Sequence, residues 1–319
     1  MTGNKIKKWL LGGVVICGLF GLMGCGMQSE SPEKQADEQA ASVTEDQIDT
    51  PLEQTLEMQG EEMEMQTESV IEKAEQTETT GLQDLQLSIL GDSISTFEGY
   101  IPEGHHVFYP YSGEVTEVEQ TWWKQLLTDT GMELCSNASS SGSTCAGDST
   151  SMDNPQYGCS DYRVAELVGQ GGVYPDVIIV YMGTNDLLTG VPIGENDGTQ
   201  YVEEGMVENF SDAYCMMLDK ITMYYPGAQI FCCTLPPIGD WGTEQPFITF
   251  VNGQNLTSAE YSEVICKIAT AKDYPVIDLQ NCGITIDNMQ QFVTDGVHLN
   301  PDGMFVIKEA IKKTLEEYY

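Results

Sequence analysis

Five short apolar runs, separated by longer amphipathic segments, are the feature that most limits what this chain can fold into. The runs are LQLSILG, MELCSNA, DVIIVYMG, AQIFCCTL and YPVIDL, at residues 85–91, 132–138, 176–183, 228–235 and 274–279. Several are apolar throughout, which is typical of strands that are covered on both faces. Because strands that alternate with helices favour βαβ units, the pattern predicts a doubly wound, mostly parallel five-stranded sheet.

The segments between these runs carry the expected helices. They lie near residues 119–130, 160–170, 200–225 and 256–272, and a last helix opens at Asn300-Pro301 and runs to about Glu317. No internal repeat or second domain is evident in the sequence. We therefore expect residues 84–319 to form one α/β domain.

The first 25 residues have the pattern of an export signal. Three lysines precede an apolar run at residues 9–23, which is short for a helix that spans a bilayer. The run ends in LMGC, residues 22–25, which resembles the bacterial lipobox, where the cysteine is lipidated and becomes the new N-terminus. The resemblance implies that Cys25 anchors an extracytoplasmic lipoprotein to the cell membrane. An ordinary secretory signal and an uncleaved anchor are the alternatives.

Residues 26–83 have the composition of a tether. Glu, Gln, Ser and Thr dominate this segment, which cannot bury enough apolar surface to fold by itself. A flexible coil of this length has an end-to-end distance of roughly 40 Å, and its like charges extend it further. The alternative is a fluctuating helix over residues 53–78, where Met and Leu recur at irregular helical spacings.

Charge and cysteine content exclude some functions. The chain has 50 acidic and 13 basic side chains and a formal charge of -37, so it repels nucleic acid and anionic membrane surfaces. No Cys-x-x-Cys or His-Glu-x-x-His pattern indicates a metal, and no cofactor is expected. Among the eight cysteines that follow the signal, Cys145 and Cys159 flank one loop and are the plausible disulfide pair.

Three polar clusters come directly after predicted strands. They are Gly91-Asp92-Ser93, NASSSGS at residues 137–143, and GTND at residues 183–186. Ligands of doubly wound sheets bind at the carboxyl ends of the strands, so these clusters are candidates for a site. Each cluster taken alone is also compatible with a turn or a helix cap.

A nucleophilic role for Ser93 requires a base, because an unassisted hydroxyl stays protonated at neutral pH. The chain has three histidines. His105 and His106 are consecutive in an extended segment, so their side chains point to opposite faces and are poorly placed to share a metal. His298 follows Asp295 by three residues, a spacing that lets the carboxylate orient the imidazole as in triad chemistry.

In chain order, GDSIS, SSGS, GTND and DGVHLN resemble the motif blocks of the SGNH/GDSL hydrolase family, over residues 87–303. The resemblance implies a flavodoxin-like three-layer α/β/α fold and a serine esterase. It implies Ser93 as nucleophile, His298 as base and Asp295 as the residue that orients the base. It also implies an oxyanion hole made of the Ser93 and Gly142 backbone N–H groups and the Asn185 side-chain amide. The serine-rich loop leaves a choice among the neighbours of Gly142.

The expected activity is that of a cell-surface esterase that forms an acyl-enzyme on Ser93 and removes short acyl groups from carbohydrate. Residues 84–319 carry 8 basic and 34 acidic side chains, a net charge of -26 that disfavours anionic substrates. A lysophospholipase or thioesterase for longer acyl chains is an alternative. A catalytically inactive module that binds glycans is another. Trp241, in the loop after the fourth predicted strand, could flank a ligand.

Overall fold

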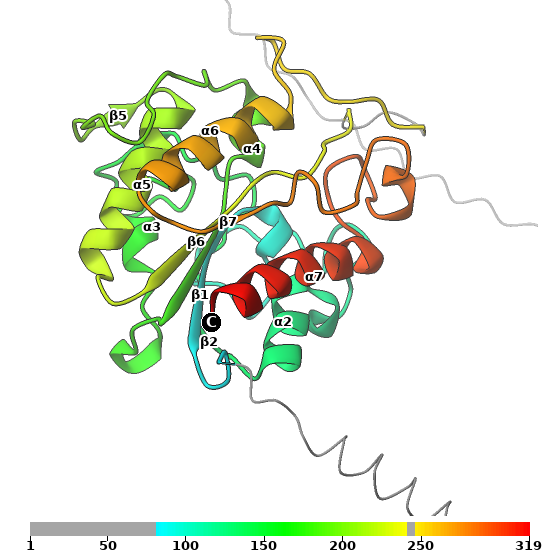
Figure 1. Ribbon diagram of the computed structural model, residues 1–319, viewed down its shortest axis with the longest axis horizontal. Coiled ribbons are helices and arrows are strands. Elements are labelled where there is room, and N and C mark those ends of the chain that lie inside the picture. The colour runs from blue at the N-terminus through cyan, green and yellow to red at the C-terminus, as the bar shows by residue number, and fades with distance from the viewer. Residues whose placement is uncertain (1–80, 241–245) are drawn as a thin grey trace, which may run out of the picture. The chain divides into compact units, whose positions relative to one another are not determined.

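Five parallel strands form the central sheet of the domain, in the order β2, β1, β4, β6, β7 (Figure 1). The structure is a computed structural model that describes residues 81–240 and 246–319, so the signal sequence with Cys25 and almost all of the tether lie outside it. Each strand falls within its predicted range, which confirms the parallel sheet. The strands are β1 (Gln86–Gly91), β2 (Glu133–Asn137), β4 (Val177–Tyr181), β6 (Gln229–Cys233) and β7 (Val276–Ile277).

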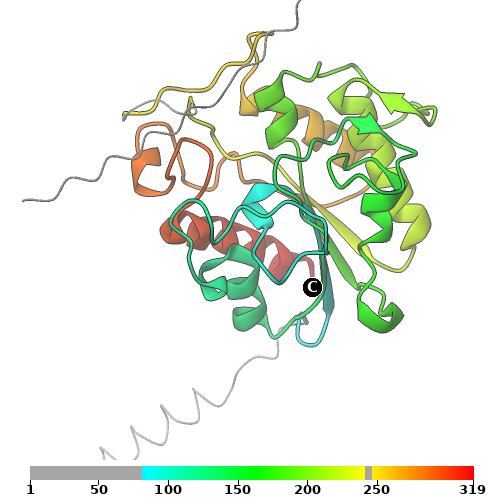
Figure 2. The same ribbon diagram turned by 180° about the vertical axis from the view of Figure 1, so that it is seen from behind.

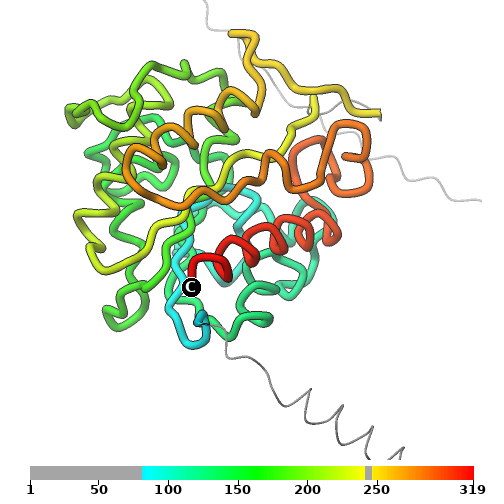
Figure 3. The backbone as a smooth tube through the Cα atoms, in the orientation of Figure 1, coloured from blue at the N-terminus to red at the C-terminus, as the bar shows by residue number. Residues whose placement is uncertain are grey.

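Helices cover both faces of this sheet and give the domain three layers. On one face α2 (Trp122–Thr130) packs beside α7 (Pro301–Tyr318), as the tube in Figure 3 also shows. The other face carries α3 (Asp161–Ala165), α5 (Phe210–Tyr224) and α6 (Ser258–Ala271), seen from behind in Figure 2. The expected α/β/α architecture is therefore confirmed.

Shorter elements complete the described part of the chain. One short helix, α4 (Thr184–Thr189), follows β4, and β3 (Gly147–Asp148) pairs with β5 (Met206–Val207) in a small antiparallel sheet. Four single turns of 3-10 helix are η1 (Ser93–Ser95), η2 (Val118–Gln120), η3 (Gln170–Gly172) and η4 (Met289–Gln291). Among the described helices, none is long and apolar enough to cross a membrane.

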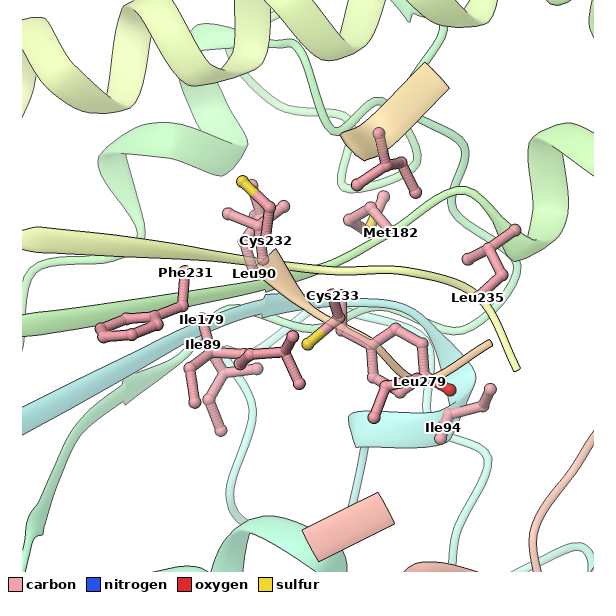
Figure 4. Packing of buried hydrophobic residues seen from close by; sticks show 14 of the residues in the cluster. Ile89, Leu90, Ile94, Ile179, Met182, Phe231, Cys232, Cys233, Leu235 and Leu279 are labelled. Carbon is pink, nitrogen blue, oxygen red and sulfur yellow. The ribbon is translucent and has the colours of Figure 1, made fainter. Parts of the chain in front are cut away.

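The strand register explains why the runs are apolar throughout. Ile89, Ile179 and Phe231 are register partners on neighbouring strands and point to one side of the sheet, while Cys232 points to the other (Figure 4). The Phe231 ring meets Tyr318 of α7 edge-on, with centroids 5.2 Å apart. Full burial of each such side chain stabilises the fold by about 1.5–3 kcal/mol. The core thereby holds the carboxyl ends of β1 and β4 at one edge of the sheet.

Two predicted helices are shorter than expected. The helix predicted over 200–225 begins at Phe210, because the Asn209 side chain caps it by accepting the Asp212 N–H at 2.9 Å. Residues 206–207 before it form a strand instead. The helix predicted over 160–170 ends at Ala165, shortly before a glycine-rich stretch that is unfavourable in a helix.

The folded domain starts slightly before residue 84. Leu82, which the sequence analysis assigns to the tether, is buried in the hydrophobic core. Next to it, the Asp84 backbone N–H donates to the Gly131 carbonyl at 3.0 Å. The end of the segment that precedes β1 is therefore packed against the domain.

Candidate active site

Ser93 stands directly after the central strand β1, in the 3-10 turn η1. The buried Asp92 side chain caps this turn, since its Oδ1 accepts the Ile94 N–H at 3.0 Å. Gly91 has no room for a side chain, because a Cβ there would come within 2.8 Å of the Ser95 and Ser139 hydroxyls. The sequence Gly-Asp-Ser thus ends the strand in a tight turn that leaves Ser93 about 4% exposed.

Asp295 and His298 lie on the loop that precedes α7. Asp295 Oδ1 accepts the backbone N–H groups of Val297 at 3.0 Å and of His298 at 2.8 Å, which closes the loop around the carboxylate. The other oxygen, Oδ2, lies 2.8 Å from His298 Nδ1. Because an ionised carboxylate can only accept, Nδ1 carries the proton and Nε2 presents its lone pair.

That lone pair faces the serine. His298 Nε2 lies 2.9 Å from Ser93 Oγ, although the two residues are 205 positions apart in the sequence. The structure therefore brings together Ser93, His298 and Asp295, the three residues that the sequence analysis selects. A hydroxyl, an imidazole and a carboxylate in this chain of hydrogen bonds can activate the hydroxyl as a nucleophile.

The charge of Asp295 suits this arrangement. Partial burial on its own would raise the pKa of the carboxyl group. The hydrogen bond to His298, the electrostatic interaction with that residue and the backbone N–H donors outweigh burial and lower the pKa below its usual value. Asp295 is consequently a carboxylate at neutral pH. It can balance the positive charge that the imidazole acquires when it takes a proton.

The predicted oxyanion donors are all available for a ligand. The backbone N–H groups of Ser93 and Gly142 donate to no other group of the described residues. Asn185 Nδ2 donates one hydrogen to the Ser143 carbonyl at 3.0 Å and retains the second. Gly142 has a φ of +79°, which glycine adopts most easily, and this conformation sets the direction of its N–H.

Two buried charged residues that the sequence analysis does not select support these loops. Asp186 accepts the N–H groups of Cys145 at 2.7 Å and Ala146 at 3.0 Å, which ties the Gly142 loop to α4. Burial raises the Asp186 pKa to about 7 although these N–H groups lower it. Arg163 Nη2 donates to the Gly91 carbonyl at 2.8 Å beneath the serine turn, and burial lowers its pKa to about 10. The Asp of GTND is itself the motif position that could have indicated Asp186, whereas Arg163 belongs to no motif.

The other two histidines lie on opposite sides of their segment. His105 is buried and its Nδ1 donates to the Ser139 carbonyl at 3.0 Å, while His106 is exposed. Gln156 Nε2 lies 3.2 Å from His106 Nδ1 and also donates to Ser140 Oγ at 3.1 Å. Neither histidine belongs to a metal-binding cluster within the described ranges.

His105 gives a prediction for acid stability. Burial lowers its pKa to about 4, well below the value of about 6.5 in an unfolded chain. As the pH falls from about 6.5 to about 4, the unfolded chain gains a proton that the folded chain does not, so the free energy of unfolding should fall by at most about 3 kcal/mol. Urea unfolding at pH 7 and pH 5 should show a smaller fall for His105→Asn than for the wild type. The control His106→Asn should keep the wild-type slope, and an unchanged slope in His105→Asn would contradict the prediction.

Two further sequence predictions have different outcomes. Trp241 lies outside the described residues. Cys145 and Cys159, the pair that could have formed a disulfide, are free and buried thiols. Burial raises the pKa of Cys159 to about 12 and raises that of Cys145 as well, so both remain protonated.

A separate cavity of about 530 Å³ lies along β2, the edge strand of the sheet. Tyr100, Ile101, Cys135 and Gln170 are among the residues that line it. None of the three residues Ser93, Asp295 and His298 contributes to its wall. The chemistry of the candidate site therefore lies elsewhere, at the carboxyl end of β1.

Comparison with known proteins agrees with this fold. Residues 85–240 match the family model GDSL-like Lipase/Acylhydrolase. The chain is similar to solved structures described as GDSL-like lipases from Bacteroides ovatus (25% identity, TM-score 0.53, covering 74% of this chain and 99% of that one) and Bacteroides uniformis (26%, 0.53, 72% and 94%). A protein from Lactobacillus plantarum (19%, 0.55, 74% and 99%) shares the fold. No curated protein gives a significant match.

Proposed function

This chain belongs to the GDSL-like lipase/acylhydrolase family and is a serine ester hydrolase, and from that premise we propose that it removes short acyl groups from carbohydrate at the bacterial cell surface. The observation that carries the catalytic part is the contact of 2.9 Å between Ser93 Oγ and His298 Nε2. The substrate and the location are supported by the charge and polarity of the domain and by the LMGC sequence.

The reaction would follow from the positions of these atoms. Ser93 Oγ attacks the ester carbonyl carbon while its proton moves to His298 Nε2, and the C–O bond of the alcohol breaks as His298 returns the proton to the leaving oxygen. Water then attacks the carbonyl carbon of the acyl-enzyme and gives a proton to His298. The bond between this carbon and Ser93 Oγ breaks as His298 returns the proton to Oγ, which releases the acid and restores the serine. In both steps, Asp295 holds the imidazole and balances its positive charge.

The tetrahedral intermediate of each step carries a negative oxygen. We assign the N–H groups of Ser93 and Gly142 and the second amide hydrogen of Asn185 to this oxygen, because none of these three hydrogens is donated to another group among the described residues. Donors that are fixed in advance stabilise the charge without reorganisation during the reaction.

The distribution of positive charge supports a neutral substrate. In the described ranges, each lysine belongs to a helix or to a helix end, and none stands on a loop at the carboxyl ends of the strands. Arg163, the single arginine of the chain, is buried and bonded to backbone carbonyls. A phosphate group of a lysophospholipid or of coenzyme A would find no basic partner there.

The polar groups around Gly142 favour an ester whose alcohol part carries further hydroxyl groups, as a sugar does. Gln156 Oε1 lies 3.5 Å from where a Cβ on Gly142 would stand, and the amide of Gln156 connects His106 and Ser140. Amide, imidazole and hydroxyl groups can exchange hydrogen bonds with sugar hydroxyls. An alkyl chain would gain little from this polar rim.

A panel of esters tests the proposal. With p-nitrophenyl esters from acetate to palmitate, kcat/KM should be highest for acetate and fall as the acyl chain lengthens, and acetylated xylan or peptidoglycan should release acetate. Ser93→Ala serves as the blank for each substrate. A maximum at long chains would favour a lysophospholipase or thioesterase. A folded protein that hydrolyses no ester but binds glycans would establish the inactive module instead.

Asn185→Ala tests the oxyanion assignment. Loss of one oxyanion donor should reduce kcat by about 10²- to 10³-fold and leave KM nearly unchanged, since the bond strengthens in the transition state. Steady-state kinetics on p-nitrophenyl acetate measure both constants, and an unchanged Tm shows that the loss of the bond to Ser143 leaves the fold intact. A wild-type kcat would remove Asn185 from the site.

The lipid anchor has its own test. We propose that Cys25 carries the lipid, so Cys25→Ala should lose metabolic labelling by a palmitate analogue and appear as an unprocessed precursor. Cys17→Ala, which changes the other cysteine of the signal region, is the control and should label normally. Hydrolysis of a soluble ester should change little in either variant. Equal labelling of Cys25→Ala would place the lipid elsewhere.

A further inference from the structure

Phe108 lies face to face with the imidazole of His298. Their ring centroids are 3.6 Å apart and their planes differ by 11°. Uncharged aromatic pairs favour offset or edge-on arrangements, whereas a cation gains most over the face of a ring. We propose that Phe108 is a positioning residue of this hydrolase, which fixes the plane of the His298 ring and stabilises its protonated form. The inference rests on the proposed role of His298 as the base.

The backbone of Phe108 is fixed to the turn that bears the nucleophile. Its N–H donates to Thr96 Oγ1 at 3.0 Å, and that hydroxyl donates to the Ser93 carbonyl at 3.0 Å. Thr96 is the residue that ends the turn. The serine turn therefore sets the position of the phenyl ring on one side of the site.

A second set of contacts connects the ring of Phe108 to the loop that carries His298. Tyr109 meets it edge-on, with centroids 4.8 Å apart and an angle of 82°. The Tyr109 hydroxyl donates to the carbonyl of Leu299, the residue after His298, at 2.8 Å. Phe108 thus joins the two loops that carry nucleophile and base, and it limits how far Nε2 can move from Oγ.

The electrostatic contribution arises during the reaction. Before proton transfer the imidazole is neutral, and afterwards it is a cation with the Asp295 carboxylate hydrogen-bonded to its Nδ1 and the phenyl ring over its face. The interaction with the ring is therefore stronger in the transition state than in the enzyme–substrate complex. Such a difference raises kcat and leaves KM unchanged. From ordinary cation–π strengths, we expect an effect of about two- to thirty-fold.

Fluorination of Phe108 separates this effect from packing. Replacing Phe108 with 4-fluoro-, 3,5-difluoro- and pentafluorophenylalanine weakens the negative face of the ring in steps while nearly preserving its shape. On p-nitrophenyl acetate, kcat should fall at each step, KM should stay constant and Tm should change little. The same series at Phe231, a buried ring that packs against α7, is the matched control and should leave kcat unchanged.

Two ordinary variants complete the test. Phe108→Tyr keeps an aromatic face and should retain most of kcat, whereas Phe108→Leu should lose at least as much as the pentafluoro variant. If kcat does not respond to fluorination in an active, folded enzyme, the electrostatic role is refuted. That result would leave the proposed function intact. An enzyme in which Ser93→Ala retains wild-type activity would instead refute the proposed function itself.

Discussion

Ser93→Ala is expected to reduce kcat for ester hydrolysis by about a millionfold, the scale on which removal of a serine nucleophile acts. The methyl group cannot form the acyl-enzyme, and His298 then has no hydroxyl at 2.9 Å to activate. The variant should also lose all covalent labelling by a fluorophosphonate probe. Initial rates on p-nitrophenyl acetate and gel fluorescence after labelling measure the two effects.

A second serine provides the control for this prediction. Ser112 is exposed and belongs to none of the motifs of the site, so Ser112→Ala should keep full activity and full labelling. Tm should be similar for both variants, because neither side chain fills the core. Labelling that persists in Ser93→Ala would identify another nucleophile.

Asp295→Asn is expected to lower kcat by about 10⁴-fold with little change in Tm. The amide can still accept the N–H groups of Val297 and His298, but its NH₂ group would face Nδ1. The imidazole would then carry its proton on Nε2, which leaves no lone pair to accept the Ser93 proton. Single-turnover kinetics with p-nitrophenyl acetate would show slow acylation.

The acid range gives a further check on Asp295. Its pKa lies below the ordinary carboxyl value, so between neutrality and about pH 4 it stays ionised and its protonation does not limit activity there. The stabilisation that its hydrogen bonds provide is present above its unfolded pKa and is lost as the pH falls through the lower folded value. Asp287→Asn, at an exposed position, should keep wild-type kcat. Wild-type kcat in Asp295→Asn would exclude Asp295 from the triad.

The strands were predictable because their signal is local and strong. Residues such as Val177–Tyr181 are apolar throughout, and their burial on both faces leaves few alternatives to a central parallel strand. The helix that opens at Asn300-Pro301 was predictable from its cap and first-turn proline. By contrast, the start of α5 depends on the Asn209 cap, which lies in a polar segment whose sequence is equally compatible with a helix.

The residues of the site likewise fall into those that a local sequence motif predicts and those that it does not. Ser93, Asn185 and His298 stand in short motifs, and the strand order places the first two at one edge of the sheet. Phe108 contacts His298, about 190 positions away, and Arg163 contacts Gly91, about 70 positions away. The residues next to Phe108 and Arg163 in the sequence do not indicate these contacts. Side-chain partners of this kind require the three-dimensional structure.

The separation of 205 residues between Ser93 and His298 links activity to completion of the fold. The first strand supplies one reactant and the loop before the last helix supplies the other, so no fragment that stops short of that loop can hydrolyse an ester. A nascent chain would be inert until almost its whole length has emerged and folded. Recovery of activity after denaturation therefore reports assembly of the entire domain, since this contact closes nearly its full length.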